Sequence, residues 1–235
     1  MFPVAILAGG LATRLKPLSD AIPKALLDVN GMPFIAQQLG LLRRNGITQV
    51  VVCAGYLGEM IQARIGDGAA FGVRLHFVFD GARLLGTAGA LKHALPWLGE
   101  NFFVLYGDSY LPCDYARVQH AFRQQGKPAL MTVFKNDGRW DQSNVEFANG
   151  QIVAYEKHAP TARMEYIDYG LGVFARAAFD LVPADQPFDL AVLYQTLLRR
   201  KQLGACQIAE RFYEIGSFAG LEETRRYLAQ QELGK

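Results

Sequence analysis

The 235-residue chain predicts a three-layer α/β fold in which helices cover both faces of a mostly parallel sheet. Over residues 1–140, short apolar runs typical of buried strands alternate with longer amphipathic runs typical of helices. Helical crossovers return the chain to the same end of a sheet, so the strands that they join are parallel. Apolar residues make up 51% of the chain and charged residues 20%, which suffices for a sizeable core.

The first strand is expected over Pro3–Ala8, an apolar run that ends at Gly9 and Gly10. Further strands are expected at 49–53, 73–79, 102–106 and 129–134, with helices at 34–44, 57–64, 87–95 and 115–125. A Rossmann-like sheet of this kind binds ligands beyond the carboxyl ends of its strands. Gly9, Gly10 and Asp108, which follows the fourth strand, therefore mark that edge of the sheet as a candidate site.

The sequence pattern changes after about residue 140. Strand-like runs at 144–147 and 151–155 are joined by Asn149-Gly150, a pair typical of tight hairpins. A strand is also expected at 167–174, a short one at 205–209, and helices at 190–200 and 218–229. Because no linker rich in proline, glycine or serine separates the two parts, we expect one domain. Its Rossmann-like half spans about 1–140 and its mixed α/β half about 141–235.

Composition excludes several classes of protein. The net charge of +2 disfavours a strongly electrostatic nucleic-acid binder. The three cysteines are widely spaced and form neither a zinc pattern nor a disulfide framework, which favours a reducing cytoplasm. No apolar run approaches the roughly 20 residues that a membrane helix needs, and the N-terminus lacks a signal-peptide pattern. We therefore expect a cytoplasmic protein with no nucleic-acid or membrane partner.

The segment that follows the first strand carries phosphate-binding chemistry. Adjacent glycines at Gly9 and Gly10 let backbone N–H groups approach a phosphate chain closely, although they also suit an ordinary tight turn. Thr13 adds a hydroxyl donor, and Arg14 adds a guanidinium that can hold phosphate oxygens in pairs. The glycine spacing matches neither the dinucleotide fingerprint nor the P-loop. Lys24 follows Pro23 and precedes an apolar run, so its backbone is expected to be fixed and its ammonium positioned.

The whole stretch from Leu7 to Val29, LAGGLATRLKPLSDAIPKALLDV, resembles the signature of the sugar-phosphate nucleotidyltransferases, LAGGxGTRLxPLTxxxPKxLLxV. Further elements resemble the same family over nearly the whole chain, at Leu85–Ala90 (LGTAGA), Tyr106–Asp108, Glu156-Lys157, Ile167–Phe174 and Tyr213–Ser217. The resemblance implies the nucleotide-diphospho-sugar transferase type of fold, in which the second half binds the sugar phosphate.

The resemblance also implies a reaction, in which an NTP and a sugar 1-phosphate give an NDP-sugar and pyrophosphate. The attacking phosphate oxygen is already anionic, so the reaction needs alignment and charge neutralisation more than a general base. LGTAGAL is similar to guanylyltransferases acting on mannose or heptose 1-phosphates, which favours a hexose or heptose 1-phosphate. Uridylyl-, thymidylyl- and cytidylyltransferases, including phosphocholine enzymes, stay open. A catalytically weak regulatory protein that binds nucleotide sugars is the alternative of another class.

The resemblance assigns roles residue by residue. The expected catalytic residues are Arg14, Lys24 and Asp108; the nucleotide-binding residues are Leu7, Ala8, Gly9, Gly10, Thr13, Arg14, Gly86 and Thr87; the sugar-phosphate-binding residues are Lys24, Asn144, Glu156, Lys157 and Asp168; and the Mg²⁺ ligands are Asp108 and Glu214. The expected partners are the NTP and the sugar 1-phosphate, and relatives in the family often form homo-oligomers.

Two positions depart from the family pattern, and several roles have a simpler alternative. Ala12 stands where the family usually has glycine, and Glu214, longer by one methylene, stands where it usually has aspartate. Without the resemblance, Asp108 is equally a solvated acid in a turn, and Lys157 a partner of Glu156. Asp168 would then cap a turn.

Overall fold

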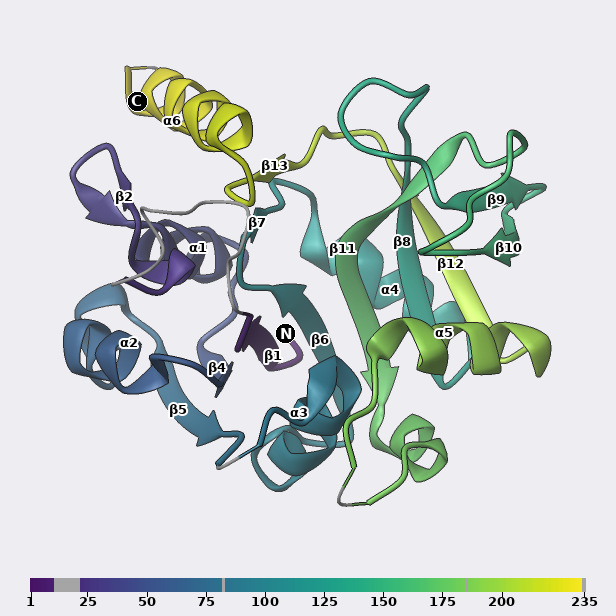
Figure 1. Cartoon of the computed structure of the whole chain (residues 1–235), viewed down its shortest axis with the longest axis horizontal. Coiled ribbons are helices and arrows are strands. Elements are labelled where there is room, and N and C mark those ends of the chain that lie inside the picture. Colours follow the sequence, from purple (N-terminus) through teal and green to yellow (C-terminus); the bar gives the residue numbers. More distant parts are fainter. Residues whose placement is uncertain (11–21, 82, 185, 234–235) are drawn as a thin grey trace.

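The computed structural model describes residues 1–10, 22–81, 83–184 and 186–233 (Figure 1). Within these ranges a single nine-stranded sheet runs through both halves of the chain, in the order β10-β9-β11-β6-β1-β4-β5, with β8 and β12 attached through β11. Helices pack on both of its faces, so the predicted three-layer α/β fold is confirmed.

Four neighbouring strands form the parallel part of the sheet. They are β1 (Val4–Ala8), β4 (Gln49–Ala54), β5 (Arg74–Phe79) and β6 (Asn101–Tyr106). The helices α1 (Phe34–Arg44), α2 (Gly58–Ile65) and α3 (Gly86–Ala94) lie between them in the sequence. The predicted bounds of these elements hold to within one residue, because each apolar run ends at a glycine, proline or polar residue.

The fifth predicted strand of the first half pairs differently from the expectation. β8 (Ala129–Lys135) does not pair with the parallel strands, because β11 (Tyr166–Ala175), antiparallel to both, lies between β6 and β8. β12 (Leu203–Ile208) then pairs in parallel with β8. The crossover through α4 (Tyr115–Gln125) set the direction of β8 correctly, but a crossover does not determine which strand becomes the neighbour.

The rest of the second half follows the predicted order. β9 (Val145–Ala148) and β10 (Gln151–Tyr155) form a hairpin, and both turn residues, Asn149 and Gly150, have positive φ, at 50° and 77°. Asparagine and glycine adopt positive φ more readily than other residues, which explains why this pair occupies the turn. The helices α5 (Leu190–Arg199) and α6 (Phe218–Leu233) follow.

Short elements complete the fold. A two-stranded hairpin pairs β2 (Asp28–Val29) with β3 (Met32–Pro33), and a separate pair joins β7 (Ser109–Tyr110) to β13 (Tyr213–Glu214). Short 3-10 helices lie at Lys24–Leu26, Ala69–Phe71, Leu95–Trp97 and Arg176–Leu181. The β7–β13 pair brings residues near the end of the chain beside Asp108.

The core lies on both faces of the sheet. Alternate residues of a strand point to opposite faces, so Ala5 packs toward α3 while Val4 and Ile6 pack toward α1. α3 and α5 cover the first face, and α1, α2 and α4 cover the second. No helix among the described residues is both long and apolar enough to cross a membrane.

Gly172 in β11 gives a test of this packing. A β-carbon at Gly172 would overlap the hydroxyl of the buried Tyr194 and approach Phe174 to 3.0 Å. We expect Gly172→Ala to lower the free energy of unfolding by about 1–3 kcal/mol, measured by urea denaturation. Adding Tyr194→Phe removes the overlapping oxygen and should restore part of the loss.

Gly40 in α1 is the matched control for Gly172→Ala. A β-carbon there would meet only the end of Arg44, at 3.5 Å. Gly40→Ala should be neutral or stabilising by up to about 1 kcal/mol. If Gly172→Ala is as stable as the parent chain, the packing of β11 against α5 is not as described.

Candidate active site

A cavity of about 530 Å³ opens at the carboxyl ends of the parallel strands. Of the predicted catalytic and nucleotide-binding residues, all those that the structure describes line it; Thr13 and Arg14, like Ala12, lie outside the described residues. The lining comprises Leu7, Ala8, Gly9, Gly10, Lys24, Ala25, Cys53, Asp80, Leu84, Gly86, Thr87, Ala90, Tyr106, Gly107 and Asp108. The sequence therefore located this cavity correctly.

Backbone packing at the strand ends leaves no room for side chains. The Gly107 N–H donates to the Leu7 carbonyl at 2.9 Å, and a β-carbon at Gly107 would lie 2.6 Å from that oxygen. A β-carbon at Gly9 would lie 3.2 Å from the Gly55 nitrogen, whereas Gly10 faces open space. Glycines thus hold β1 against its neighbours and leave exposed backbone for a ligand at Gly10.

Lys24 and Asp108, 84 residues apart in the sequence, meet at the edge of this cavity. The Lys24 Nζ atom lies 3.2 Å from Asp108 Oδ2. Lys24 begins a short 3-10 helix after Pro23, whose φ of −61° fixes the approach of the chain, and Asp108 lies two residues after the end of β6. The side chains are 21% and 37% exposed, so the pair contributes little to stability, and both groups remain accessible to a ligand.

Glu214 pairs in β13 with Ser109 of β7, the residue that follows Asp108. The Ile215 N–H donates to the Asp108 carbonyl at 2.9 Å, so the two backbones are paired. Asp108 Oδ2 and Glu214 Oε2 lie 3.6 and 2.5 Å from the point where a Gly216 β-carbon would stand. The structure therefore brings the two predicted metal ligands to the same place.

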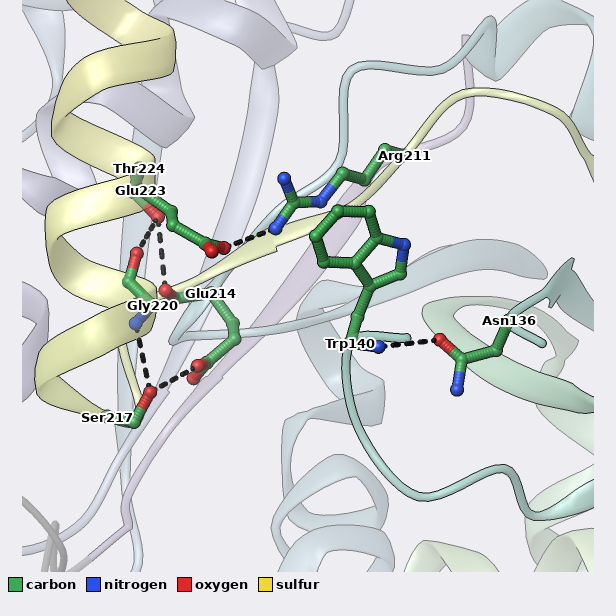
Figure 2. Close-up of polar contacts among 8 residues, drawn as sticks. All are labelled: Asn136, Trp140, Arg211, Glu214, Ser217, Gly220, Glu223 and Thr224. Carbon is green, nitrogen blue, oxygen red and sulfur yellow. Dashed lines mark hydrogen bonds and ion pairs between the residues drawn. The ribbon is translucent and has the colours of Figure 1, made fainter. Parts of the chain in front are cut away.

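The longer side chain of Glu214 folds back toward the start of α6 (Figure 2). Its Oε2 atom accepts the Gly216 N–H, and its Oε1 atom accepts the Ser217 hydroxyl at 2.9 Å. A β-carbon at Gly220 would overlap Glu214 Oε1, so the small residue there makes room for the extra methylene. No group of three or more His, Cys, Asp or Glu side chains suited to a metal occurs among the described residues. Two carboxylates suit Mg²⁺, which takes its other ligands from phosphates and water.

An aromatic contact joins the loop after β8 to α6 in the same region (Figure 2). The Arg211 guanidinium lies 3.3 Å from the centre of the Trp140 ring and pairs with Glu223 of α6. The Trp140 N–H donates to the buried Asn136 side chain at 3.3 Å. Local sequence patterns do not predict this contact, because its residues come from three separate segments of the chain.

Of the predicted sugar-phosphate residues, Lys24 lines the strand-end cavity, whereas Glu156, Lys157 and Asp168 cluster around Asn144 and form what is called here the sugar-phosphate cluster. Its side-chain oxygen accepts the Asp168 N–H at 2.9 Å, and its carbonyl accepts the Glu156 N–H at 3.0 Å. Glu156 in turn accepts hydrogen bonds from the His158 N–H at 3.1 Å and the Gln195 amide at 3.3 Å. Asn144 therefore connects the start of β9, the end of β10 and β11.

Lys157 pairs with Asp189 rather than with the adjacent Glu156. The Lys157 Nζ atom lies 3.0 Å from Asp189 Oδ2, and both side chains are more than two-fifths exposed. The other oxygen of Asp189 accepts the Thr87 hydroxyl at 3.3 Å. Thr87 lines the strand-end cavity, where nucleotide binding is predicted, so this chain of contacts connects the sugar-phosphate cluster to that cavity.

Asp168 is the one carboxyl of the sugar-phosphate cluster with a raised pKa. Burial raises the pKa of Asp168 to about 6, although a hydrogen bond from the Gly170 N–H and the charge of Lys157 oppose the change. Burial, and after it the Asp168 carboxylate, raises the pKa of Tyr106 and Tyr155, so both phenols stay protonated.

Sequence reasoning missed two acids of this region. Asp80 follows β5 and lines the cavity, where its Oδ2 atom accepts the Leu85 N–H at 3.2 Å. Burial raises the pKa of Asp80. Its position after a strand was the same signal that marked Asp108. Asp189 precedes an apolar helical run and caps α5, which is a signal for a helix start but not for a site.

Comparison with known proteins identifies the family of the chain. The family model described as nucleotidyl transferase matches residues 4–228. N-acetylmuramate α-1-phosphate uridylyltransferase of Neisseria meningitidis is 41% identical over 226 residues, which cover 94% of this chain and 95% of that protein. UTP–glucose-1-phosphate uridylyltransferase of Synechocystis is 29% identical over 79% of this chain, which spans only 52% of that longer relative.

A solved structure has the same fold. HddC of Yersinia pseudotuberculosis, determined with GMP-PN, superimposes with a TM-score of 0.80 at 22% identity, over 97% of this chain and all of that chain. The family model matches nearly the whole sequence, including the glycine segment and the positions of Lys24, Asp108 and Glu214. The chain belongs to the sugar-phosphate nucleotidyltransferase family and is an enzyme of that type.

Proposed function

We propose that the chain transfers the uridylyl group of UTP to N-acetylmuramate α-1-phosphate, releasing pyrophosphate. The observation that carries the reaction class is the Lys24–Asp108 pair in the strand-end cavity. Thr87 lines the same cavity and is connected through Asp189 to Lys157. The uridylyl group and the acidic amino sugar rest on the Neisseria relative, which matches nearly end to end. The proposed sugar substrate is therefore one compound, where the sequence predicted only a hexose or heptose 1-phosphate.

In this reaction an oxygen of the sugar phosphate bonds to the α-phosphorus of UTP. The bond from that phosphorus to the bridging oxygen of the β-phosphate breaks, and its electron pair leaves with pyrophosphate. Lys24 neutralises charge at the α-phosphate, and Lys157 holds the incoming phosphate. Arg14 and the backbone at Gly9 and Gly10 hold the remaining phosphates. Because the nucleophile is an anion, positioning and charge neutralisation carry the rate.

Mg²⁺ fits the acids at the end of β6. Asp108 and Glu214 would hold it, since both have an oxygen beside Gly216. Bound there, the ion would neutralise phosphate charge and help to align the phosphates. Asp108 also sets the position of Lys24, so the two residues are expected to act together.

The cytoplasm is the proposed location of this reaction. All three cysteines are free and buried, as Cys53, Cys113 and Cys206. Burial raises the pKa of the Cys53 and Cys113 thiols to about 12, which keeps both in the unreactive thiol form. Such residues suit a reducing compartment.

A substrate panel tests the proposed function. The purified chain is assayed for pyrophosphate release with each of five nucleotides (UTP, dTTP, CTP, GTP and ATP). Each nucleotide is combined with the 1-phosphates of N-acetylmuramate, N-acetylglucosamine, glucose, mannose and a heptose. We expect UTP with N-acetylmuramate 1-phosphate to give the highest kcat/KM, by at least about tenfold. A higher value for another pair contradicts the substrates, and binding without turnover contradicts the reaction.

Asp108→Asn and Lys24→Met test the proposed charge arrangement. Each should lower kcat by about 100-fold or more, the usual cost of losing a group that stabilises the transition state. Each should move Tm by no more than about 4 °C, because an exposed ion pair contributes about 1 kcal/mol at most. Asp137→Asn removes the exposed pair with Lys135, at 3.7 Å, and is the matched control with unchanged kinetics. Near-normal turnover in Asp108→Asn would refute its role.

Asp168 gives a pH test. If the ionised carboxyl accepts hydrogen bonds from the sugar, the KM for the sugar phosphate rises as pH falls through about 6, while the KM for UTP is less affected. The phosphate of the sugar also titrates near pH 6, at about that value for phosphate monoesters. Asp168→Asn, assayed in the same buffers, separates the titration of Asp168 from that of the substrate phosphate, because only the phosphate titrates in that variant. Identical pH profiles for the two proteins would exclude the role of Asp168.

The same shift predicts a change in stability. The pKa of Asp168 is about 6 in the folded chain and 3.8 ordinarily, so the folded state binds more protons between these values. Stability conferred by this group therefore falls as pH rises through that window. The Tm of Asp168→Asn relative to the parent should increase from pH 4 to pH 7. A constant difference would contradict the raised pKa.

A further inference from the structure

Asp189 stands where the two parts of the site meet. It directly precedes α5, which begins beside α3 in Figure 1. Its Oδ1 atom accepts the Ala191 N–H at 2.8 Å and the Thr87 hydroxyl at 3.3 Å, and its Oδ2 atom accepts Lys157 Nζ at 3.0 Å. One carboxylate thus joins a helix start, the wall of the nucleotide cavity and the lysine of the sugar-phosphate cluster.

The segment that carries Asp189 is docked against the start of α3. The Ala88 N–H donates to the Phe188 carbonyl at 2.9 Å, and the Phe188 N–H donates to the Leu85 carbonyl at 2.9 Å. Gly86 has a φ of +71°, and a β-carbon there would lie 2.7 Å from the Phe188 oxygen. The Leu190 N–H donates to the Thr87 hydroxyl at 2.7 Å. The position of Asp189 relative to the nucleotide cavity is therefore fixed by backbone contacts.

Lys157 lacks such support of its own. It follows β10 at an exposed turn, and a lysine side chain carries about 2 kcal/mol of rotamer entropy when it is free. The contact to Asp189 holds its ammonium at a defined distance from Thr87. An ammonium has three donors, so one can stay on Asp189 while the others bind a phosphate.

We propose that Asp189 is a positioning residue for the sugar-phosphate half of the reaction, which fixes Lys157 against the Gly86–Thr87 turn. The role of Asp189 rests on the proposed function, because it requires Lys157 to bind the substrate phosphate. Repulsion between Asp189 and that phosphate is weak, since three donors and the start of a helix already offset the negative charge. The pKa of Asp189 agrees: although burial raises it, these hydrogen bonds and the Lys157 charge hold it below its ordinary value.

Asp189→Asn separates positioning from helix capping. Asparagine caps a helix about as well as aspartate and still offers an oxygen to Thr87, but it lacks the charge that holds Lys157. We expect the KM for the sugar 1-phosphate to rise by about fivefold, the KM for the nucleotide to change by less than twofold, and kcat to change little. Asp114→Asn is the matched control, because Asp114 caps α4 at 3.0 Å from the Arg117 nitrogen and lies outside the site.

A labelling measurement tests the contact without substrate. The Lys157 amine is modified with acetic anhydride, and its rate is followed by mass spectrometry in the parent, Asp189→Asn and Asp114→Asn. The Asp189 carboxylate holds the ammonium at 3.0 Å and shields it from the reagent, so Asp189→Asn, which releases the amine, should react about two- to fivefold faster, and Asp114→Asn at the parent rate. This result holds whatever reaction the enzyme catalyses.

The two readouts identify what has failed. Faster labelling with an unchanged or lower KM for the sugar phosphate overturns the positioning role, even though the contact exists. Unchanged labelling overturns the contact itself. If Lys157→Ala leaves the KM for the sugar phosphate unaltered, the proposed role of Lys157 fails, and that of Asp189 fails with it.

Discussion

The pairing of β11 with β6 is the constraint on which the site depends. β6 ends at Tyr106 and leads into Gly107 and Asp108, which line the strand-end cavity, whereas β11 begins with Tyr166 and carries Asp168. Antiparallel pairing places the start of β11 at the same edge of the sheet as the end of β6. The residues that contact the two phosphate-bearing substrates in the proposed reaction therefore meet at one edge, although they come from different halves of the chain.

Charge is balanced locally at this edge. Lys24 pairs with Asp108 at 3.2 Å, and Lys157 pairs with Asp189 at 3.0 Å, each at a partly exposed position. Pairs of this kind contribute little to stability, and each ammonium has three donors, so in the proposed reaction a lysine can bind a phosphate while its carboxylate contact remains. The carboxylates keep the lysines oriented in the free enzyme, where a phosphate would otherwise have to order them. The same arrangement thus serves folding and binding without a large cost to either.

Local sequence patterns predicted the elements, and the long motif predicted residues that line the strand-end cavity. Runs such as 34–44 and 115–125 coincide with α1 and α4 because their apolar spacing and their ends are local properties. The insertion of β11 beside β8 depends on pairing between distant strands, which periodicity does not contain. The Lys157–Asp189 contact was missed for the same reason: 32 residues separate the two, and Asp189 alone resembles an ordinary helix cap.

Glu214 shows why a departure from a family pattern must be judged together with its surroundings. In the sequence, the extra methylene put its role as a ligand in doubt. In the structure, the side chain bends back onto Gly216 and Ser217, and Gly220 leaves the volume that the bend requires. The carboxylate consequently remains beside Asp108 despite its greater length. A β-carbon at position 220 would overlap the Glu214 carboxylate and lie 2.6 Å from the Glu214 backbone carbonyl, so a larger residue there would displace both the backbone and the side chain of Glu214. The position of this acid beside Asp108 therefore depends on the glycine.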